Sequence, residues 1–183
     1  MSTALNGKKV AILVANGFEQ SEMTGPRKAL EDAGATTEIV SPTEKEVKGW
    51  QHDHWGDSFP VDVPLSDAEA DDYDALLLPG GVMNPDILRT NPDALQFVKT
   101  FFDDRKPVGA ICHGPWTLIN AGVIRGRRVT SYESIQEDLR NAGARWVDQE
   151  VVVDNGLVTS RNPDDVPAFS RKLVEEVGEG KPR

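Results

Sequence analysis

Cysteine is nearly absent from this sequence: one residue, Cys112, among 183. A single cysteine cannot form a disulfide within the chain, so a disulfide-stapled fold is excluded and a reducing compartment is favoured. A chain of this length can bury roughly 70% of its unfolded surface in one core, without disulfides or metals. We therefore expect a single domain over residues 1–183, with residues 178–183 as a frayed tail.

Long hydrophobic runs are also missing. No segment approaches the ~20 apolar residues that span a membrane, and the run Val10–Ala15 has the length of a strand. Residues 1–17 lack the apolar stretch and small-residue cleavage site of a signal peptide. We expect no membrane partner and a cytoplasmic location.

Positive charge is scarce. Lys and Arg total 20 against 30 Asp and Glu, which gives a formal net charge of −10. A protein with this balance repels the phosphate backbone of DNA and RNA. No nucleic-acid partner is expected.

Only three histidines occur: His52, His54 and His113. Class I glutaminases and α/β-hydrolases both need a histidine downstream of their nucleophile, and none follows His113. Neither triad can therefore be built within this chain. The His-x-His pair in "QHDHWGD" places two imidazoles on one face of an extended segment, but no third nitrogen or sulfur ligand is evident. A pocket rim, a subunit contact and a solvated loop all remain open for His52 and His54, and we expect no metal and no cofactor.

Short apolar runs alternate with helical patterns along the chain. Strands are predicted at 8–15, 36–41, 73–81, 106–112 and 127–132. Helices are predicted at 26–34, 91–105, 113–122, 134–143 and 162–177, with Pro26 near the start of the first. The sequence Asp-Asn-Gly within 146–161 predicts a hairpin, and the acidic segment 42–72 an excursion with one short hairpin. This alternation predicts an α/β fold, a mostly parallel sheet with helices on both faces.

The excursion also holds Trp50, Trp55 and Phe59. Large aromatic side chains in a polar segment often pack at interfaces. Both a subunit contact and packing onto the domain's own core remain open.

Cys112 follows a predicted strand and precedes a predicted helix, in "VGAICHGPWTLI". This layout resembles a nucleophile elbow, in which the reactive side chain stands above the sheet edge and small residues such as Gly109 and Gly114 relieve crowding. The helix N-terminus and the imidazole of His113 would both lower the thiol pKa, so we expect a thiolate. The alternative is an inert, buried cysteine.

A nucleophile that attacks a carbonyl needs donors for the oxyanion. The strand in "LLLPGG" ends in two glycines, which allow close backbone approach. We expect the N–H groups of Gly81 and His113 to be the donors. A plain strand-to-helix turn is the alternative.

Several stretches together resemble one family: "GFEQSEMTGP", "LLLPGG", "AICHGPWTLINAG" and the segment from "GRRVTSYESIQ" to "TSRNPDD". The sequence is similar to the PfpI-type intracellular proteases of the ThiJ/PfpI superfamily over nearly its whole length. The resemblance implies a flavodoxin-like three-layer sandwich that works as a dimer or larger ring. It assigns the nucleophile to Cys112, its partner to His113 and a glutamate after the first strand to Glu19.

The resemblance also implies an acid supplied by a neighbouring subunit. The nearest match is Asp86, although the family usually has glutamate there and this loop is one residue longer. We expect Glu19 to be neutral and to donate a hydrogen bond to Cys112, because burial raises a glutamate pKa and a charged carboxylate would disfavour a thiolate. The alternative for Glu19 is a carboxylate at a helix start.

The resemblance implies a stress-protective, cysteine-dependent hydrolase or lyase, either peptidase-like or acting on methylglyoxal and glycated groups. Its partners would be a small-molecule or peptide substrate and further copies of the chain. The alternative is a non-enzymatic oligomer, either a chaperone or a redox sensor whose cysteine reports peroxide.

Overall fold

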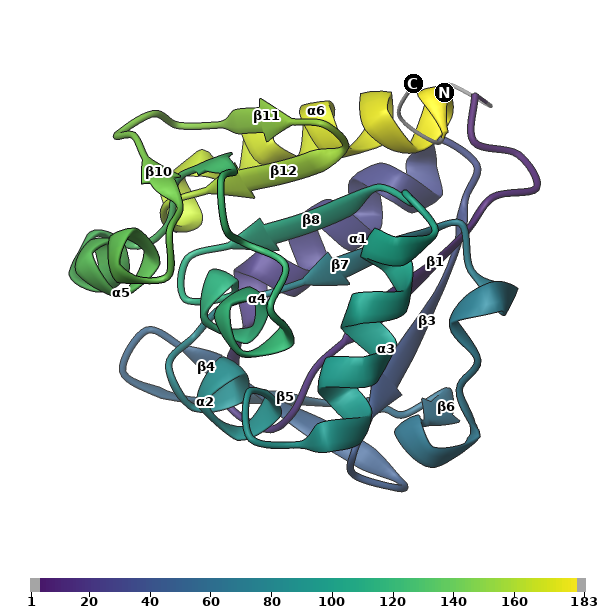
Figure 1. Ribbon diagram of the computed structural model, residues 1–183. Helices are drawn as coiled ribbons and strands as arrows, with labels where there is room; N and C mark the ends of the chain where they lie inside the picture. The colour runs from purple at the N-terminus through teal and green to yellow at the C-terminus, as the bar shows by residue number, and fades with distance from the viewer. Residues whose placement is uncertain (1–3, 181–183) are drawn as a thin grey trace.

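A mostly parallel sheet forms the centre of the molecule (Figure 1). The computed structural model describes residues 4–180, and seven strands of these residues lie in the order β11-β12-β8-β7-β1-β3-β6. Their bounds are β1 Lys9–Leu13, β3 Thr36–Ser41, β6 Val63–Pro64, β7 Ala75–Leu78, β8 Val108–Ile111, β11 Val152–Asp154 and β12 Leu157–Ser160. Neighbours pair in parallel, except β11 with β12. The predicted fold class is confirmed.

Helices cover both faces of this sheet and form two cores with it (Figure 1). One core lies under α1 (Gln20–Asp32) and α6 (Val166–Glu179), and the other under α3 (Pro92–Asp103) and α4 (Pro115–Ala121). Successive strand residues point to opposite faces. In β1, Val10 and Ile12 therefore join the first core, while Ala11 and Leu13 join the second.

The segment 42–72 contains the hairpin expected there. Strands β4 (Glu46–Gln51) and β5 (His54–Pro60) pair antiparallel, and β4 also pairs with β2 (Phe18–Glu19). Trp50 and Trp55 contact each other edge to face across the hairpin, with ring centroids 5.3 Å apart. Phe59 packs against Phe18 at 5.8 Å, which favours local packing for this residue. The chain continues through the short 3-10 turns η1 (Leu65–Asp67) and η2 (Ala70–Asp72).

The predicted core strand at 127–132 is wrong. Only β9 (Arg128–Val129) is extended there, and it pairs with β10 (Arg145–Trp146) in a separate two-stranded sheet. The position beside β8 is taken by β12, so the main sheet has no free edge there. The turn η3 (Glu133–Ile135) and helix α5 (Gln136–Asn141) connect the two short strands.

The structure corrects the start of one predicted helix and adds one helix that the sequence does not predict. Helix α1 begins at Gln20, so Pro26 lies inside it and not in its first turn. The earlier start buries Glu22 and Met23, and this packing outweighs the lost Pro26 N–H bond. Helix α2 (Met83–Leu88) was not anticipated.

The Asp-Asn-Gly hairpin is confirmed, because Asn155 and Gly156 have φ values of 52° and 86° between β11 and β12. The last helix follows η4 (Pro163–Asp165) and ends at Glu179, two residues beyond the predicted end. Of the predicted frayed tail, residues 181–183 lie outside the described residues. None of the helices described within 4–180 is long and apolar enough to span a membrane.

Candidate active site

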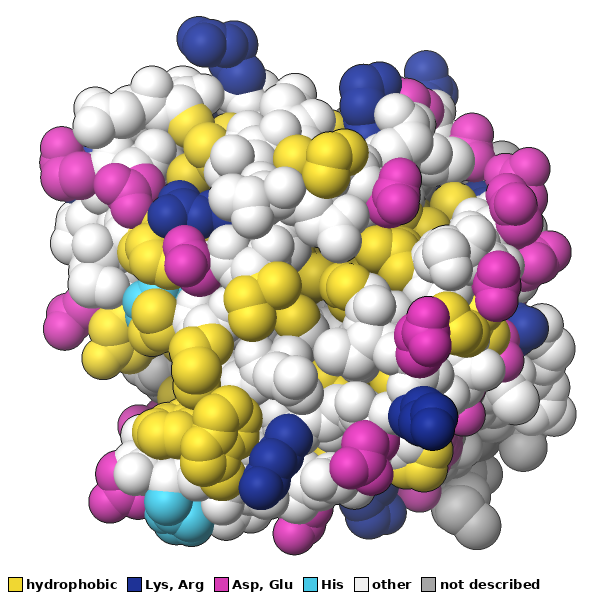
Figure 2. Space-filling model, turned by 90° about the horizontal axis from the view of Figure 1, so that it is seen from below, with side chains coloured by type: hydrophobic (Ala, Val, Ile, Leu, Met, Phe, Trp, Pro, Cys, Tyr) yellow, Lys and Arg dark blue, Asp and Glu magenta, His cyan; other side chains and the backbone are white. Residues whose placement is uncertain are grey.

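A pocket of about 820 Å³ opens where the carboxyl ends of the central strands meet. Its walls come from the segments that follow β1, β7, β8, β9 and β12, together with the end of β4 and the β4–β5 turn. The neighbouring helix α2 exposes Met83 and Ile87, which are 38% and 46% accessible. Figure 2, a view from below relative to Figure 1, shows a compact group of exposed hydrophobic side chains at the lower left, with histidine atoms beside it.

Cys112 lies on a sharp turn between β8 and α4, with a φ of 63°. The turn is held by backbone bonds from Cys112 N–H to Ser160 O at 3.0 Å and from Gly114 N–H to Ile111 O at 2.9 Å. A Cβ on Gly114 would lie 2.7 Å from the carbonyl oxygen of Leu78, so glycine is required there. The predicted elbow geometry is therefore present. Cys112 is only 6% accessible, yet it lines the pocket.

Glycine is needed at position 109 for a different reason from the one that the sequence suggests. A Cβ there would lie 2.9 Å from Phe169 and 3.0 Å from Leu173, both on α6. Gly109 therefore allows α6 to pack closely on β8, and it does not relieve crowding at the Cys112 turn.

His113 contacts both the thiol and a serine. Its Nδ1 lies 3.2 Å from Cys112 Sγ, and its Nε2 lies 3.4 Å from Ser134 Oγ. The ring stacks on Tyr132 with centroids 4.8 Å apart and meets Trp116 edge to face at 5.1 Å. Burial lowers the pKa of His113 below its ordinary value, so the imidazole is neutral near pH 7. With Nε2–H directed to Ser134, Nδ1 is free to accept the thiol proton.

Glu22, in the first turn of α1, is the carboxyl group that faces Cys112. It is fully buried, and its Oε1 accepts a hydrogen bond of 3.0 Å from Gly80 N–H. Burial, reinforced by the charge of Glu19, raises the pKa of Glu22 to about 8. The side chain is therefore neutral near pH 7. Its carboxyl proton can be donated to the sulfur once the thiol ionises.

Glu19 does not occupy the predicted place. Its carboxylate accepts a hydrogen bond of 3.3 Å from His52 N–H and lies 3.1 Å from His52 Nδ1. The reason is the start of α1. Glu19 is still extended in β2 and points toward the hairpin, whereas Glu22, three residues later, is on the helix beneath Cys112. The predicted contact between Glu19 and Cys112 is wrong, and Glu22 makes it instead.

The thiolate expected in the resting protein also needs correction. Burial raises the pKa of the Cys112 thiol, and a charged Glu22 raises it further. The backbone N–H groups of Gly81 and His113 hydrogen-bond to the sulfur and act in the opposite direction. Desolvation is the larger effect, so the resting thiol is protonated at neutral pH and must transfer its proton to a base before it can attack.

Gly81 and His113, the two predicted oxyanion residues, thus lie together beside the sulfur. Gly81 has a φ of 76°, and a Cβ there would collide with the carbonyl oxygen of Gly17. Only glycine can bring its N–H into this position. The arrangement offers two backbone donors to an oxygen atom formed next to Sγ.

The two histidines of the excursion both line a neighbouring recess of about 350 Å³, but only one of them also reaches the pocket at Cys112. His52 lines the pocket with Cys112, but it has a φ of 58° in the β4–β5 turn, so the expected extended segment is absent. His54 lies outside that pocket and pairs with Asp53, at 2.6 Å from Nδ1 to Oδ1. Between residues 4 and 180 no three His, Cys, Asp or Glu side chains are grouped as metal ligands would be.

Asp86 does not line the pocket within its own chain. It is on α2, more than half exposed, and forms an ion pair of 2.9 Å with Arg89. The guanidinium of Arg89 lies over the ring of Trp116, at 4.4 Å, and Trp116 contacts His113. Its proposed role from a neighbouring subunit stays a prediction.

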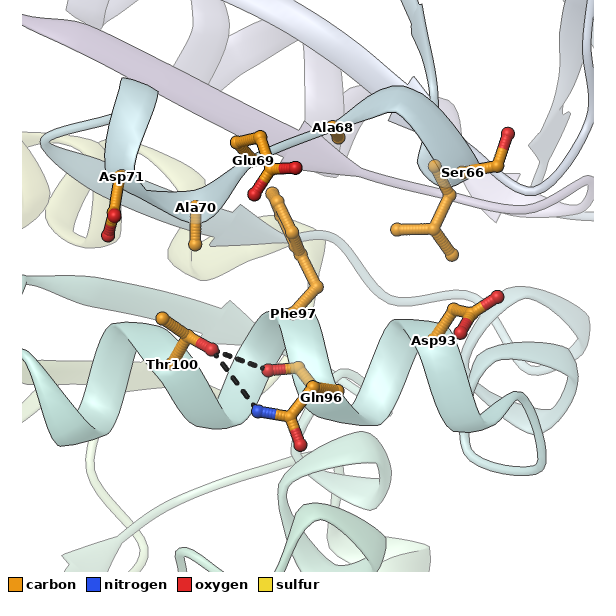
Figure 3. Close-up of a pocket in the computed structure, with 10 residues that line it drawn as sticks. Ser66, Ala68, Glu69, Ala70, Asp71, Asp93, Gln96, Phe97 and Thr100 are labelled. Carbon is orange, nitrogen blue, oxygen red and sulfur yellow. Dashed lines mark hydrogen bonds between the residues drawn. The ribbon is translucent and has the colours of Figure 1, made fainter.

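Another hollow, of about 360 Å³, lies between α3 and the η1–η2 segment (Figure 3). Glu69, Asp71 and Asp93 line it, and Gln96 and Thr100 hydrogen-bond to each other on its α3 side. It contains no cysteine or histidine, and so no nucleophile with a base beside it. The pocket at Cys112 is therefore the candidate active site.

Sequence reasoning missed Glu22, Tyr132 and Ser134. Glu22 could have been found from the sequence, because it lies in the motif "GFEQSEMTGP". The position of Pro26 predicts a later helix start, so Glu22 was not recognised as a helical residue facing the sheet. Tyr132 was hidden by the strand predicted at 127–132, and Ser134 by its place at the start of the helix predicted at 134–143. A hydrogen bond from Tyr132 N–H to Cys112 O, at 2.9 Å, holds this segment beside the nucleophile.

Comparison with known proteins identifies one family, by a sequence model and by individual relatives. The sequence model of the DJ-1/PfpI family matches residues 8–176. The chain is 48% identical to "General stress protein 18" of Bacillus subtilis over 170 residues, which cover 92% of this chain and 96% of that one. It is 46% identical to the "Putative cysteine protease YraA" of the same organism, over 91% of this chain and 96% of the relative.

Solved structures agree with this. Drosophila melanogaster DJ-1beta superposes with a TM-score of 0.85 at 27% identity, covering 97% of this chain and 91% of its own. Because the family model spans most of the sequence and both relatives are almost half identical along nearly their whole length, this chain belongs to the DJ-1/PfpI family.

Proposed function

We propose that the protein is a stress-protective, cysteine-dependent hydrolase or lyase that acts on the carbonyl carbon of a small molecule or a short peptide. The observation that carries the proposal is the 3.2 Å contact between Cys112 Sγ and His113 Nδ1 at a pocket. A nucleophile and its base need to lie within hydrogen-bond reach of each other, and here they do. The names of two relatives, "General stress protein 18" and "Putative cysteine protease YraA", support the same class.

The first step follows from the protonation states. Neutral His113 takes the thiol proton at Nδ1, and its Nε2–H remains directed to Ser134. The sulfur then forms a bond to the substrate's carbonyl carbon, and the carbonyl π electrons move to oxygen. The N–H groups of Gly81 and His113 stabilise that oxyanion. Neutral Glu22 adds no negative charge beside the sulfur at this stage and can donate a hydrogen bond to it.

The later steps depend on the substrate. With an acyl substrate, the tetrahedral adduct collapses, the leaving amine takes the proton from imidazolium, and water hydrolyses the thioester with His113 as base. With methylglyoxal, the sulfur adds to the aldehyde, a proton moves from the first carbon to the second, and water releases lactate. Carbon one is then oxidised and carbon two reduced, with no outside oxidant.

The test is to measure lactate formed from methylglyoxal and cleavage of short fluorogenic peptides, each with wild type and Cys112→Ala. We expect the variant to lose the activity that wild type shows. Full activity of Cys112→Ala in both assays would overturn the assignment of the nucleophile.

A second function is favoured by the contact between Glu22 and Cys112. A neutral carboxyl beside a cysteine can hydrogen-bond a sulfinate, the product of two successive oxidations of the thiol by peroxide. The protein would then be a redox sensor, with no turnover. Mass spectrometry after treatment with dilute peroxide tests it. We expect two added oxygens on Cys112 in wild type and further oxidation to the sulfonate in Glu22→Leu.

We also propose that the protein is an oligomer. Apolar side chains of α2 and its start stand in solvent beside the pocket, among them Val82, which is 55% accessible. A second copy covering them would narrow the pocket and remove them from water. Sedimentation velocity at micromolar concentration tests this, and a monomer would contradict it.

A further inference from the structure

We infer that the pocket at Cys112 accepts uncharged or cationic electrophiles and rejects anionic ones, with Glu19 and Asp164 as the residues that set this preference. The inference rests on the proposed function and specifies its substrate class. It excludes substrates that carry a carboxylate or phosphate near the reacting carbon.

The charged residues that line the pocket give the first argument for this preference. Among the described residues that line the pocket there is no lysine or arginine, whereas two carboxylates, Glu19 and Asp164, face it. Asp164 is exposed and forms no ion pair within residues 4–180. Glu19 is held in place by the His52 N–H and ring. An anion entering the pocket meets repulsion from these two carboxylates and no lysine or arginine that offsets it, and the His52 ring is already paired with Glu19.

The nearest arginines along the chain are already committed elsewhere. Arg161 precedes the pocket segment 162–164, but its guanidinium bonds Asp165 at 2.9 Å and Asp148 at 2.9 Å. Arg89, at the end of α2, is held by Asp86 and lies over Trp116. Neither lines the pocket. A carboxylate on the substrate would therefore lack the bidentate partner that such groups usually have in binding sites.

The floor of the pocket adds no positive charge. Glu22 and His113 are both neutral near pH 7, so neither offers a cation to an incoming anion. The Gly81 and His113 N–H groups face the sulfur, where they serve the oxygen formed in the reaction. They are too few to hold a second negative group at the same time. The remaining walls include Trp50 and Met83, which suit an apolar substituent.

Two alkylating reagents of nearly the same shape test the inference. Iodoacetamide is neutral and iodoacetate is anionic, and both transfer a carbon to the ionised sulfur with loss of iodide. The ratio of their second-order rates at Cys112 is compared with the ratio for a small neutral thiol, N-acetylcysteinamide. We expect the protein to favour iodoacetamide by about fivefold or more beyond that thiol, a size expected for one or two partly screened charges.

Matched variants separate the pocket from the overall charge. Asp164→Asn and Glu19→Gln each remove one negative charge at the pocket, and the Gln keeps an acceptor for His52 N–H. Asp71→Asn removes the same charge from the other hollow (Figure 3). We expect the first two to bring the ratio toward that of the small thiol and the third to leave it unchanged. A wild-type ratio equal to the small thiol's, or an equal effect of Asp71→Asn, overturns the inference.

The labelling experiment does not depend on turnover, so the two proposals can fail separately. Charge selectivity without any activity on methylglyoxal or peptides overturns the proposed function alone. Turnover without charge selectivity overturns this inference alone. If neither reagent labels Cys112, both proposals fail, because each requires this sulfur to attack an electrophile that enters the pocket.

Discussion

Cys112 Sγ lies 3.2 Å from Nδ1 of the next residue, His113. Side chains of adjacent residues usually diverge, and here the left-handed backbone of Cys112 turns them toward each other. The thiol is protonated at rest, so this contact is the route by which the nucleophile is generated. The base is supplied by the same turn that positions the sulfur.

Replacing His113 with Asn tests the base. We expect kcat for the Cys112-dependent reaction to fall by about 100-fold to 10,000-fold, the usual contribution of general acid–base catalysis. Circular dichroism and the melting temperature show whether the variant is folded. A folded variant with wild-type kcat would mean that another group removes the thiol proton.

Ser134 is a positioning residue, because it directs the Nε2–H of His113 and leaves Nδ1 to the thiol. We expect Ser134→Ala to lower kcat about fivefold to tenfold, as for a lost hydrogen bond of about 1 kcal/mol, with KM unchanged. We also expect the midpoint of the pH–rate profile to shift, which a merely structural role would not cause. Ser66→Ala, at the other hollow, is the control.

Glu22 should control the reactivity of Cys112 through its proton. Glu22→Gln keeps an N–H donor for the sulfur, whereas Glu22→Leu keeps none. We therefore expect the pKa of the Cys112 thiol to be higher in the Glu22→Leu variant than in the Glu22→Gln variant. The pH dependence of iodoacetamide labelling measures it. Equal thiol pKa values in wild type and both variants would show that the carboxyl does not act on the sulfur.

Glu22 also predicts how stability changes with pH. Its pKa is about 8 in the folded protein and near 4.5 when exposed, so between these values the folded state holds a proton that the unfolded state has lost. The stabilisation is complete below pH 4.5 and disappears as pH rises to about 8, a loss on the order of a few kcal/mol. Urea unfolding at pH 5 and pH 8 measures it. In the Glu22→Gln variant, we expect a smaller decrease in the free energy of unfolding between pH 5 and pH 8.

Asp86 can be tested by mixing two inactive chains. If a neighbouring subunit supplies this carboxylate, Asp86→Asn and Cys112→Ala are each inactive as pure proteins. Co-expressed, they form mixed oligomers in which some sites hold both residues, and we expect activity to return. Full activity of Asp86→Asn alone would leave Asp86 only as the partner of Arg89.

The sequence predicted the order of strands and helices well because buried parallel strands and amphipathic helices carry strong periodic signals. It also predicted the turn at Cys112 and the glycine N–H beside it, since both depend on residues that few other conformations tolerate. The prediction failed where tertiary packing, and not the local sequence, determines the structure. The start of α1 overrode the Pro26 signal and moved the key glutamate from Glu19 to Glu22.

The same limit explains the other misses. The stretch 127–132 looks like a core strand, but pairing partners are chosen by the whole sheet, and β12 pairs with β8 instead. The ionised thiol was expected from nearby groups, whereas burial, which a sequence does not display, dominates the pKa. Roles that need a second subunit are likewise invisible in one chain.

The left-handed backbone at Cys112 has one more consequence. Such a conformation is strained for a residue with a Cβ, at a cost of about 1–3 kcal/mol, and glycine adopts it without penalty. Replacing the nucleophile with glycine should therefore raise the melting temperature while it removes the chemistry. Selection for thermal robustness alone would then discard the residue on which the proposed activity depends.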